Sequence, residues 1–192
     1  MFLFYGVVIY IMANKIKQMI TIEDFYRIDD QIKATWGKNL YKYIDYCGLE
    51  PIRPMQCAGY FCTPKNSLTF ASTGGDGVHF GIVSGSNNKV NAGPIVMTVP
   101  MADINNVVVA EDLEEFFSIG YYVGWFALEQ ILYDLEEAIE YFSKPDDEMS
   151  QKEIRFLDMV RKELSIKPVP LSKQRLKELE EMYFPVLKID KD

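Results

Sequence analysis

Residues 63–110 contain several segments in which apolar side chains occur at every second position. This stretch constrains the fold more than any other part of the chain. Val78, Phe80 and Ile82 lie every second residue, as the buried side chains of a half-buried β-strand do. The same alternation recurs at 68–71 and 95–99, and residues 107–110 form a short apolar run. The stretch therefore predicts four strands of one sheet.

A glycine-rich run, Gly74-Gly75-Asp76-Gly77, separates the first two of these strands. Glycine adopts positive φ without steric cost, so the run favours a tight reversal and a β-hairpin. A phosphate-binding loop is the alternative, but such a loop leads from a strand into the amino end of a helix. Because a strand follows here, a turn is the better interpretation, and no cofactor is predicted.

Helical patterns lie on both sides of the predicted sheet in the chain, with apolar residues at three- and four-residue steps. Gly48 is placed where a helix commonly ends, and Ser150 begins a capping box with Glu153. The longest helix, 125–142, has one apolar stripe and is expected to lie on the sheet. The predicted helices cover residues 21–36, 38–47, 111–117, 125–142, 151–164 and 172–183.

The connection that leads into the sheet is less regular. Pro51 and Pro54 bracket a segment predicted as non-helical, and residues 58–62 suit either a short edge strand or a loop. Together the elements predict an α+β fold, with a mixed or antiparallel sheet of about four to six strands flanked by helices. The expected organisation is an apolar segment at 1–20, an α+β domain at 21–145 and a helical extension at 146–192.

The first thirteen residues are almost wholly apolar. They are short for a membrane span of about 20 residues, and no basic residue precedes them. Three interpretations stay open: a start assigned too early, with translation beginning at Met12 or Met19, a segment packed on the fold, or a membrane anchor. The first is favoured, so a membrane is not an expected partner.

The formal net charge of the chain is −8. Binding to nucleic acid phosphates needs a surface rich in lysine and arginine, so nucleic acid is not an expected partner. Residues 111–153 hold thirteen acids and two lysines. This stretch is either a solvated face that keeps the protein in solution or a surface for a basic protein partner.

The chain has three cysteines, Cys47, Cys57 and Cys62, and none of them forms a CxxC pair. An odd number at low density is typical of a reducing compartment, which indicates the cytoplasm. His79 is the sole histidine in the sequence, and no cysteine and histidine spacing suits zinc, so no metal site is expected.

Asp76 and His79 are the residues that most resemble a catalytic pair. An acid and a histidine can act in general acid and base catalysis. Cys62 and Ser72 are the nearest candidate nucleophiles in sequence, but neither lies in a recognisable nucleophile motif. The alternative, which we favour, is an aspartate that anchors the turn and a partly exposed histidine.

An aromatic cluster follows the predicted sheet at residues 116–126. Tyrosine and tryptophan carry much of the binding energy at protein interfaces, although aromatic residues also fill cores. Tyr121 and Trp125 are the candidate partner anchors, because the polar tip of each permits partial exposure.

Five pieces of this sequence follow one another in a characteristic order. They are the strand Leu68-Thr69-Phe70-Ala71, the turn Gly74-Gly75-Asp76-Gly77, the strand Val78-His79-Phe80-Gly81-Ile82, the segment Gly93-Pro94-Ile95-Val96, and the segment from Val109 to Phe117 (VAEDLEEFF). Over residues 63–120 this order resembles the carboxy-terminal half of the SUKH superfamily, of which the chain looks like a divergent member.

The resemblance implies an α+β fold and a binding protein without catalytic residues. Many members of the family are bacterial immunity proteins that neutralise toxins, often nucleases, and others are regulatory scaffolds. Through the resemblance we expect the acid-rich stretch to meet a basic toxin, with Tyr121 and Trp125 as anchors. The candidate rim residues of that interface are Glu114, Glu115, Glu136, Glu137 and Glu140. The competing hypothesis is a small hydrolase or ligand-binding domain that uses Asp76 and His79 beside the glycine turn.

Overall fold

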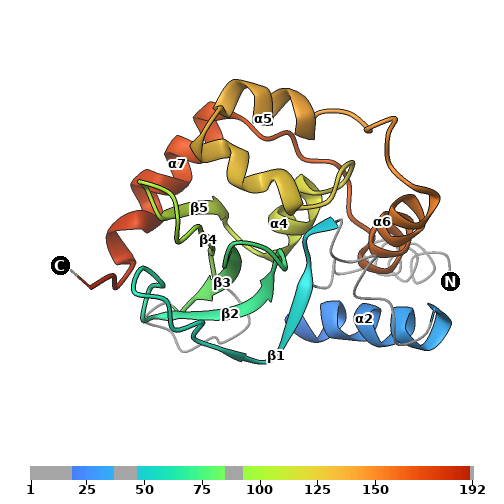
Figure 1. Ribbon diagram of the computed structural model, residues 1–192, viewed down its shortest axis with the longest axis horizontal. Coiled ribbons are helices and arrows are strands. Elements are labelled where there is room, and N and C mark those ends of the chain that lie inside the picture. Colours follow the sequence, from blue (N-terminus) through green and yellow to red (C-terminus); the bar gives the residue numbers. More distant parts are fainter. Residues whose placement is uncertain (1–18, 37–46, 85–92, 191–192) are drawn as a thin grey trace, which may run out of the picture.

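The computed structural model describes residues 19–36, 47–84 and 93–190. Five antiparallel strands form one sheet in which each strand pairs with the next along the chain (Figure 1). This confirms the predicted α+β fold and the predicted range of strand number. The strands are β1 (Glu50–Gln56), β2 (Ser67–Ser72), β3 (His79–Val83), β4 (Ile95–Thr98) and β5 (Asn106–Ala110).

The glycine-rich run closes the predicted hairpin between β2 and β3. The amide of Thr73 donates to the carbonyl of Val78 over 3.0 Å, and the residues between them turn through positive φ at Gly74 (79°), Asp76 (48°) and Gly77 (74°). Side chains are strained in this region, and aspartate tolerates it better than most residues do. The turn therefore follows from local chemistry, as predicted.

β1 is the strand that the sequence did not indicate. It runs through Pro51 and Pro54, and its register with β2 shifts between Pro51 and Gln56. Proline lacks the N–H that a central strand needs, but an edge strand tolerates it, and β1 lies at the edge of the sheet. The segment predicted as a non-helical connection is thus a strand, and residues 58–62 form a loop.

Every residue of β3 and of β4 is buried, so these strands are covered on both faces rather than half-buried. On one face Phe70 and Phe80 pack against Phe116 of α4 (Leu113–Ile119), with ring centroids 5.5 and 5.0 Å apart. On the other face the loop at 60–64 covers the sheet through bonds to His79 and Asn106. Alternate residues of these strands therefore point to two different buried sides of the sheet, one under α4 and one under the loop at 60–64.

The prediction of one long helix at 125–142 is wrong, because the structure has two shorter helices there. A 3-10 helix, η2 (Phe126–Leu132), comes first, and α5 (Leu135–Phe142) begins anew behind Asp134. The Asp134 carboxylate accepts the amide of Glu137 over 3.0 Å and so caps a new helix start. α5 packs against η2 at the outside of the molecule (Figure 1).

The remaining helices lie on opposite sides of the sheet in Figure 1, with α7 on one side and α2 and α6 on the other. α2 (Ile22–Trp36) packs with α6 (Gln151–Leu164), which starts at the predicted Ser150 capping box, and both helices are as predicted. α7 (Lys173–Tyr183) packs beside β5 and is followed by the 3-10 helix η3 (Phe184–Val186). Apolar residues of α6 and α7 join the same hydrophobic core as α2 and the sheet.

Three expectations fall wholly or partly outside the described residues: the apolar segment, the alternative starts at Met12 and Met19, and most of the helix at 38–47. Met19 is described and exposed, and Gly48 has the positive φ of 69° expected after a helix. Within the described ranges no helix is long and apolar enough to cross a membrane.

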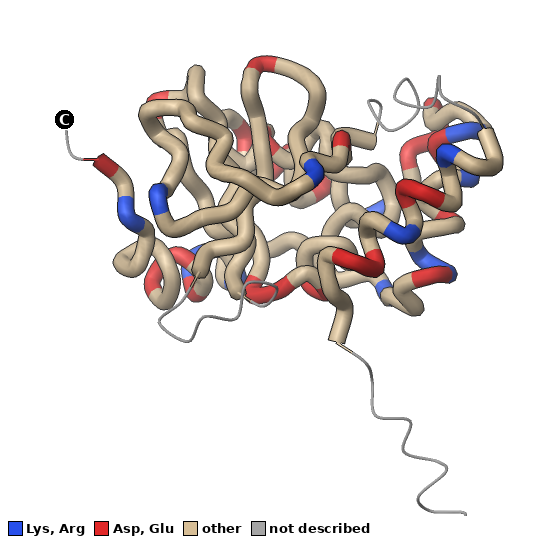
Figure 2. Tube along the Cα trace, turned by 90° about the horizontal axis from the view of Figure 1, so that it is seen from below, with Lys and Arg blue, Asp and Glu red and all other residues tan. Residues whose placement is uncertain are grey.

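Charge is distributed unevenly over these elements. The strands β2 to β5 contain no charged residue. Figure 2 shows the acidic and basic residues on the helices and loops around this largely uncharged sheet. Surfaces for a charged partner are therefore found on the helices.

Candidate functional site

A row of polar residues crosses the sheet at the end near the glycine turn. Each strand contributes one residue, and neighbours in the row are register partners. The loop at 60–64 closes over this row, where the Asn106 amide donates to the Cys62 carbonyl over 3.0 Å. The row comprises Glu50, Ser72, His79, Thr98 and Asn106.

His79 is committed to this internal network. Its side chain is 3% exposed, its Nδ1 lies 2.7 Å from the Gly77 carbonyl oxygen, and its Nε2 lies 3.1 Å from Thr63 Oγ1. A carbonyl only accepts, so Nδ1 donates to Gly77 and Nε2 accepts from the Thr63 hydroxyl. Burial lowers the pKa of His79, which favours this neutral form. The expectation of a partly exposed histidine is wrong, and neither nitrogen is left for a substrate.

A groove of about 340 Å³ does lie beside the glycine turn and brings Asp76, Ser72 and His79 together. The Ser72 hydroxyl donates to the Glu50 carboxylate over 3.4 Å, and Cys62 is buried with the pKa of its thiol raised by burial. An activated nucleophile needs a free base beside it or a lowered pKa. His79 is therefore not a free base in this groove, Cys62 is not an activated thiol, and Ser72 and Glu50 are bonded to each other.

The buried histidine makes a prediction about pH. Because its pKa is lower in the folded protein than the value of about 6.5 in an unfolded chain, protons bind preferentially to the unfolded state below that pH. Stability should therefore fall as the pH drops below about 6.5, by at most about 1.4 kcal/mol per pH unit from this one group. Urea unfolding at pH 7.5 and 5.5 should show a smaller loss for His79→Gln than for the natural chain. Equal losses would contradict the assignment.

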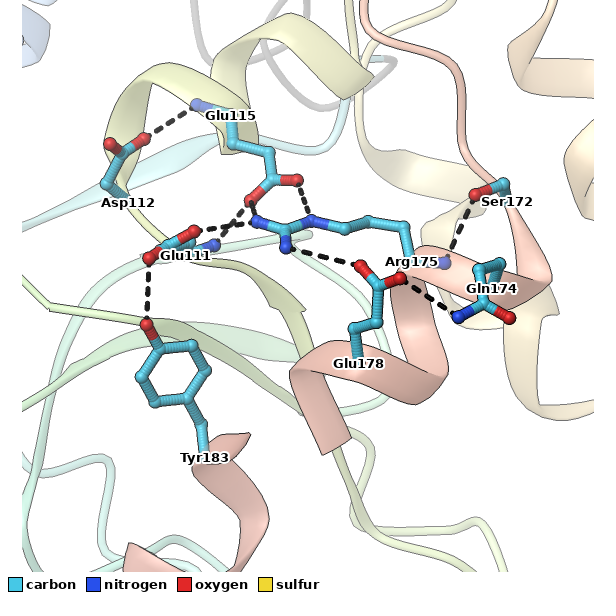
Figure 3. Close-up of polar contacts among 8 residues, drawn as sticks. All are labelled: Glu111, Asp112, Glu115, Ser172, Gln174, Arg175, Glu178 and Tyr183. Atoms are coloured by element: carbon cyan, nitrogen blue, oxygen red, sulfur yellow. Dashed lines mark hydrogen bonds and ion pairs between the residues drawn. The ribbon is translucent and has the colours of Figure 1, made fainter. Parts of the chain in front are cut away.

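Glu115, a predicted rim residue, is instead part of an ion-pair cluster that fastens α7 to the start of α4 (Figure 3). Arg175 Nε lies 2.7 Å from Glu115 Oε1, and Arg175 Nη2 lies 2.8 Å from Glu111 Oε2. The Tyr183 hydroxyl donates to Glu111 over 3.0 Å. These contacts raise the pKa of Arg175 and lower the pKa of Glu111. Glu114, another predicted rim residue, directly precedes Glu115 on α4 and is half-buried.

The prediction that Trp125 is an exposed partner anchor is wrong, because its side chain is 0% exposed. Its indole nitrogen donates to the Phe116 carbonyl over 2.8 Å, and its ring stacks on Phe116 with centroids 5.8 Å apart. Tyr121 is half-buried, and the Arg161 guanidinium lies over its ring at 4.7 Å from the centroid. Neither residue is presented as a free anchor.

Two of the other three predicted acids, Glu137 and Glu140, meet at a cavity of about 460 Å³ between η2 and α5, which we call the α5 groove. Its α5 side contains Glu137, Ala138, Glu140 and Tyr141, and Lys144 follows. Its η2 side contains Ala127 and Gln130. Glu136 is exposed on the same helix but is not among the lining residues. The break at Asp134 creates the groove, because it lets α5 turn back beside η2.

The groove lies in the most acidic part of the described chain. Residues 134–148 hold seven acids and one lysine. Lys144 Nζ lies 2.8 Å from Glu140 Oε1, which lowers the pKa of Glu140 and raises that of Lys144. The Glu136 and Glu137 carboxylates have no hydrogen-bond or ion-pair partner among the residues that the structure describes. These two charges are available to a partner.

Exposed aromatic side chains accompany these acids, and the sequence interpretation missed them. Phe126, Tyr133 and Tyr141 are 50%, 58% and 37% exposed. A signal for Tyr141 was present, because it follows Glu137 by four residues and therefore lies on the same face of a helix. Tyrosine beside carboxylate is a combination suited to binding a cationic partner.

No protein-family model, curated protein or solved structure matches this chain.

Proposed function

We propose that the chain is a non-catalytic partner-binding protein of the kind that the SUKH resemblance implies, an immunity protein that neutralises a basic toxin, such as a nuclease, in the cytoplasm. The α5 groove carries this proposal. It gathers two of the predicted acids and an exposed tyrosine at a cavity of about 460 Å³ in the most acidic part of the described chain.

The charge and the shape of this surface suit such a role. A concentrated negative surface accelerates encounter with a cationic protein and opposes binding of other acidic proteins. A nuclease binds phosphate through cationic residues, so a carboxylate face can occupy the same site. The exposed tyrosines supply the aromatic contacts that dominate binding energy at many interfaces.

A second candidate function, binding of a small ligand at the glycine turn, has one observation in its favour. The groove there joins Asp76, His79 and Ser72. Because both nitrogens of His79 are bonded within the protein, this candidate is a binding site and not a hydrolase. It predicts that protection against a toxin is independent of the α5 acids.

Charge reversal on α5 tests the proposal. The triple variant E136K/E137K/E140K should lose protection when it is co-expressed with a basic toxin that the natural chain neutralises, and its affinity for that toxin should fall by about 100-fold or more, because attraction becomes repulsion. Isothermal titration gives the affinity, and far-UV circular dichroism confirms the fold.

The matched control is D103K/E180K/E181K, which makes the same change in net charge at exposed acids outside the groove. It should retain most of the affinity and all of the protection. If both triple variants lose affinity equally, the interaction depends on overall charge and α5 is not the binding surface.

A further inference from the structure

We infer that the α5 groove receives an arginine side chain of the partner, with the guanidinium between Glu137 and Glu140 and against the ring of Tyr141. The inference rests on the proposed function, since it names the chemistry that the same surface recognises. It is carried by the shape of the cavity, the placement of the two carboxylates and the tyrosine that lines it.

The size and lining of the groove suit one long side chain. Binding sites for small groups occupy roughly 300–1,000 Å³, and this cavity of about 460 Å³ lies near the lower end of that range. Ala127 and Ala138 present small apolar side chains, one from η2 and one from α5. The methylene stem of an arginine can pack on such a surface while its charged head reaches the acids.

The two acids are arranged for a forked cation. Glu137 and Glu140 are three residues apart on α5, so they are neighbours on the helix surface. A guanidinium is planar, carries five donors and can bond two carboxylates at once, whereas an ammonium is a compact point charge. Gln130 adds an amide from the η2 side. The donor and acceptor pattern therefore favours arginine over lysine.

Tyr141 provides the aromatic part of the site. Its hydroxyl donates to Asp146 over 3.3 Å, and its ring packs edge-to-face on the buried Phe142 at 5.7 Å. These contacts hold the ring at the groove while the side chain stays 37% exposed. A guanidinium over such a ring gains a cation–π attraction, which is more frequent for arginine than for lysine.

Lys144 occupies part of the site in the free protein. Its ammonium is paired with Glu140 at 2.8 Å, and the two side chains are 63% and 74% exposed. An ion pair this exposed contributes little stability, so an incoming guanidinium can replace the ammonium at Glu140. Lys144 then acts as an internal competitor for the partner.

The inference is tested without the toxin, with N-acetyl-arginine amide and N-acetyl-lysine amide as probes. Each is titrated into the labelled full-length protein while NMR follows the methyl groups of Ala127 and Ala138. We expect saturable shifts at both methyls and a dissociation constant about fivefold lower for the arginine probe, the factor that one additional contact of this kind supplies. Shifts scattered over the surface, or equal affinities, would overturn the inference.

Four variants sharpen the result. Glu137→Gln should weaken arginine binding about fivefold, whereas the matched control Glu148→Gln, outside the groove lining, should leave it unchanged. Tyr141→Leu removes the ring and should abolish the preference for arginine. Tyr141→Phe keeps the ring, disturbs the fold least and should preserve the preference. Preference retained in Tyr141→Leu would refute the role of the ring.

Lys144→Gln gives an effect of opposite sign. It should tighten arginine binding about twofold to fivefold by freeing Glu140, while Lys167→Gln, an equal change of charge elsewhere, should not. Loss of toxin protection in E136K/E137K/E140K is a separate readout. If the groove binds the arginine probe but E136K/E137K/E140K keeps its protection, the arginine site stands and the proposed function is rejected. If the variant loses protection but the natural chain does not bind the probe, the arginine site alone is rejected.

Discussion

Trp125→Ala is expected to lower the free energy of unfolding by about 3–5 kcal/mol, the cost of removing a large aromatic side chain from a packed core. The indole is 0% exposed and packs on Phe116 and Phe117, with centroids 5.8 and 5.7 Å apart. Gly120 lies so close that a Cβ there would meet the indole ring at 2.2 Å. Urea unfolding followed by circular dichroism measures the loss.

Trp125→Phe is the control for this prediction. It keeps an aromatic ring and removes the hydrogen bond from the indole nitrogen to the Phe116 carbonyl, which leaves a buried acceptor unpaired and costs about 1–3 kcal/mol. Both variants should bind the arginine probe normally where they are folded. A Trp125→Ala protein of unchanged stability that no longer binds its partner would restore the interpretation of Trp125 as an anchor.

Arg175→Ala is expected to lower the free energy of unfolding by about 1–2 kcal/mol and to loosen α7 locally, since hydrogen bonds to charged groups are strong but this guanidinium is partly in water. Its removal leaves the Glu111 and Glu115 carboxylates beside each other without their shared cation (Figure 3). α7 buries only Leu176 and Leu179 among its own residues, so the cluster is a large part of its attachment. Amide hydrogen exchange across 173–183 should accelerate more than exchange in α6.

Arg155→Ala is the matched control, because Arg155 is exposed on α6 and takes part in no described ion pair. It should change neither stability nor exchange. The effect of Arg175→Ala should shrink at 1 M salt, where the Debye length is about 3 Å. Unchanged exchange in α7 would show that its apolar residues suffice to hold it.

Much of the fold could be predicted because it depends on neighbours in the sequence. The glycine turn needs positive φ at three of four consecutive positions, and Gly74 and Gly77 supply two of them without strain. Ser150 and Glu153 bond to each other across one turn and begin α6 where the capping box predicts. These interactions join residues three to five positions apart and are therefore visible in a sequence.

The candidate site was predicted only in part. Glu137 and Glu140 were identified by charge and do meet at the α5 groove, but charge alone does not say which acids are already paired. Glu115 looked equivalent and is bonded to Arg175, 60 residues away in the chain. Aromatic character likewise did not separate the buried Trp125 from the exposed Tyr141.

The sequence by itself determined where β2 and β3 reverse and where most of the described helices begin, because turns and caps are closed by residues a few positions apart. Tertiary structure alone decided that both faces of the sheet are covered, that His79 is enclosed beneath the loop at 60–64, and that α5 turns back on η2 to form a groove. The physical reason is that burial and ion pairing depend on which distant segment of the chain packs against a surface. Local periodicity does not indicate which segment that is.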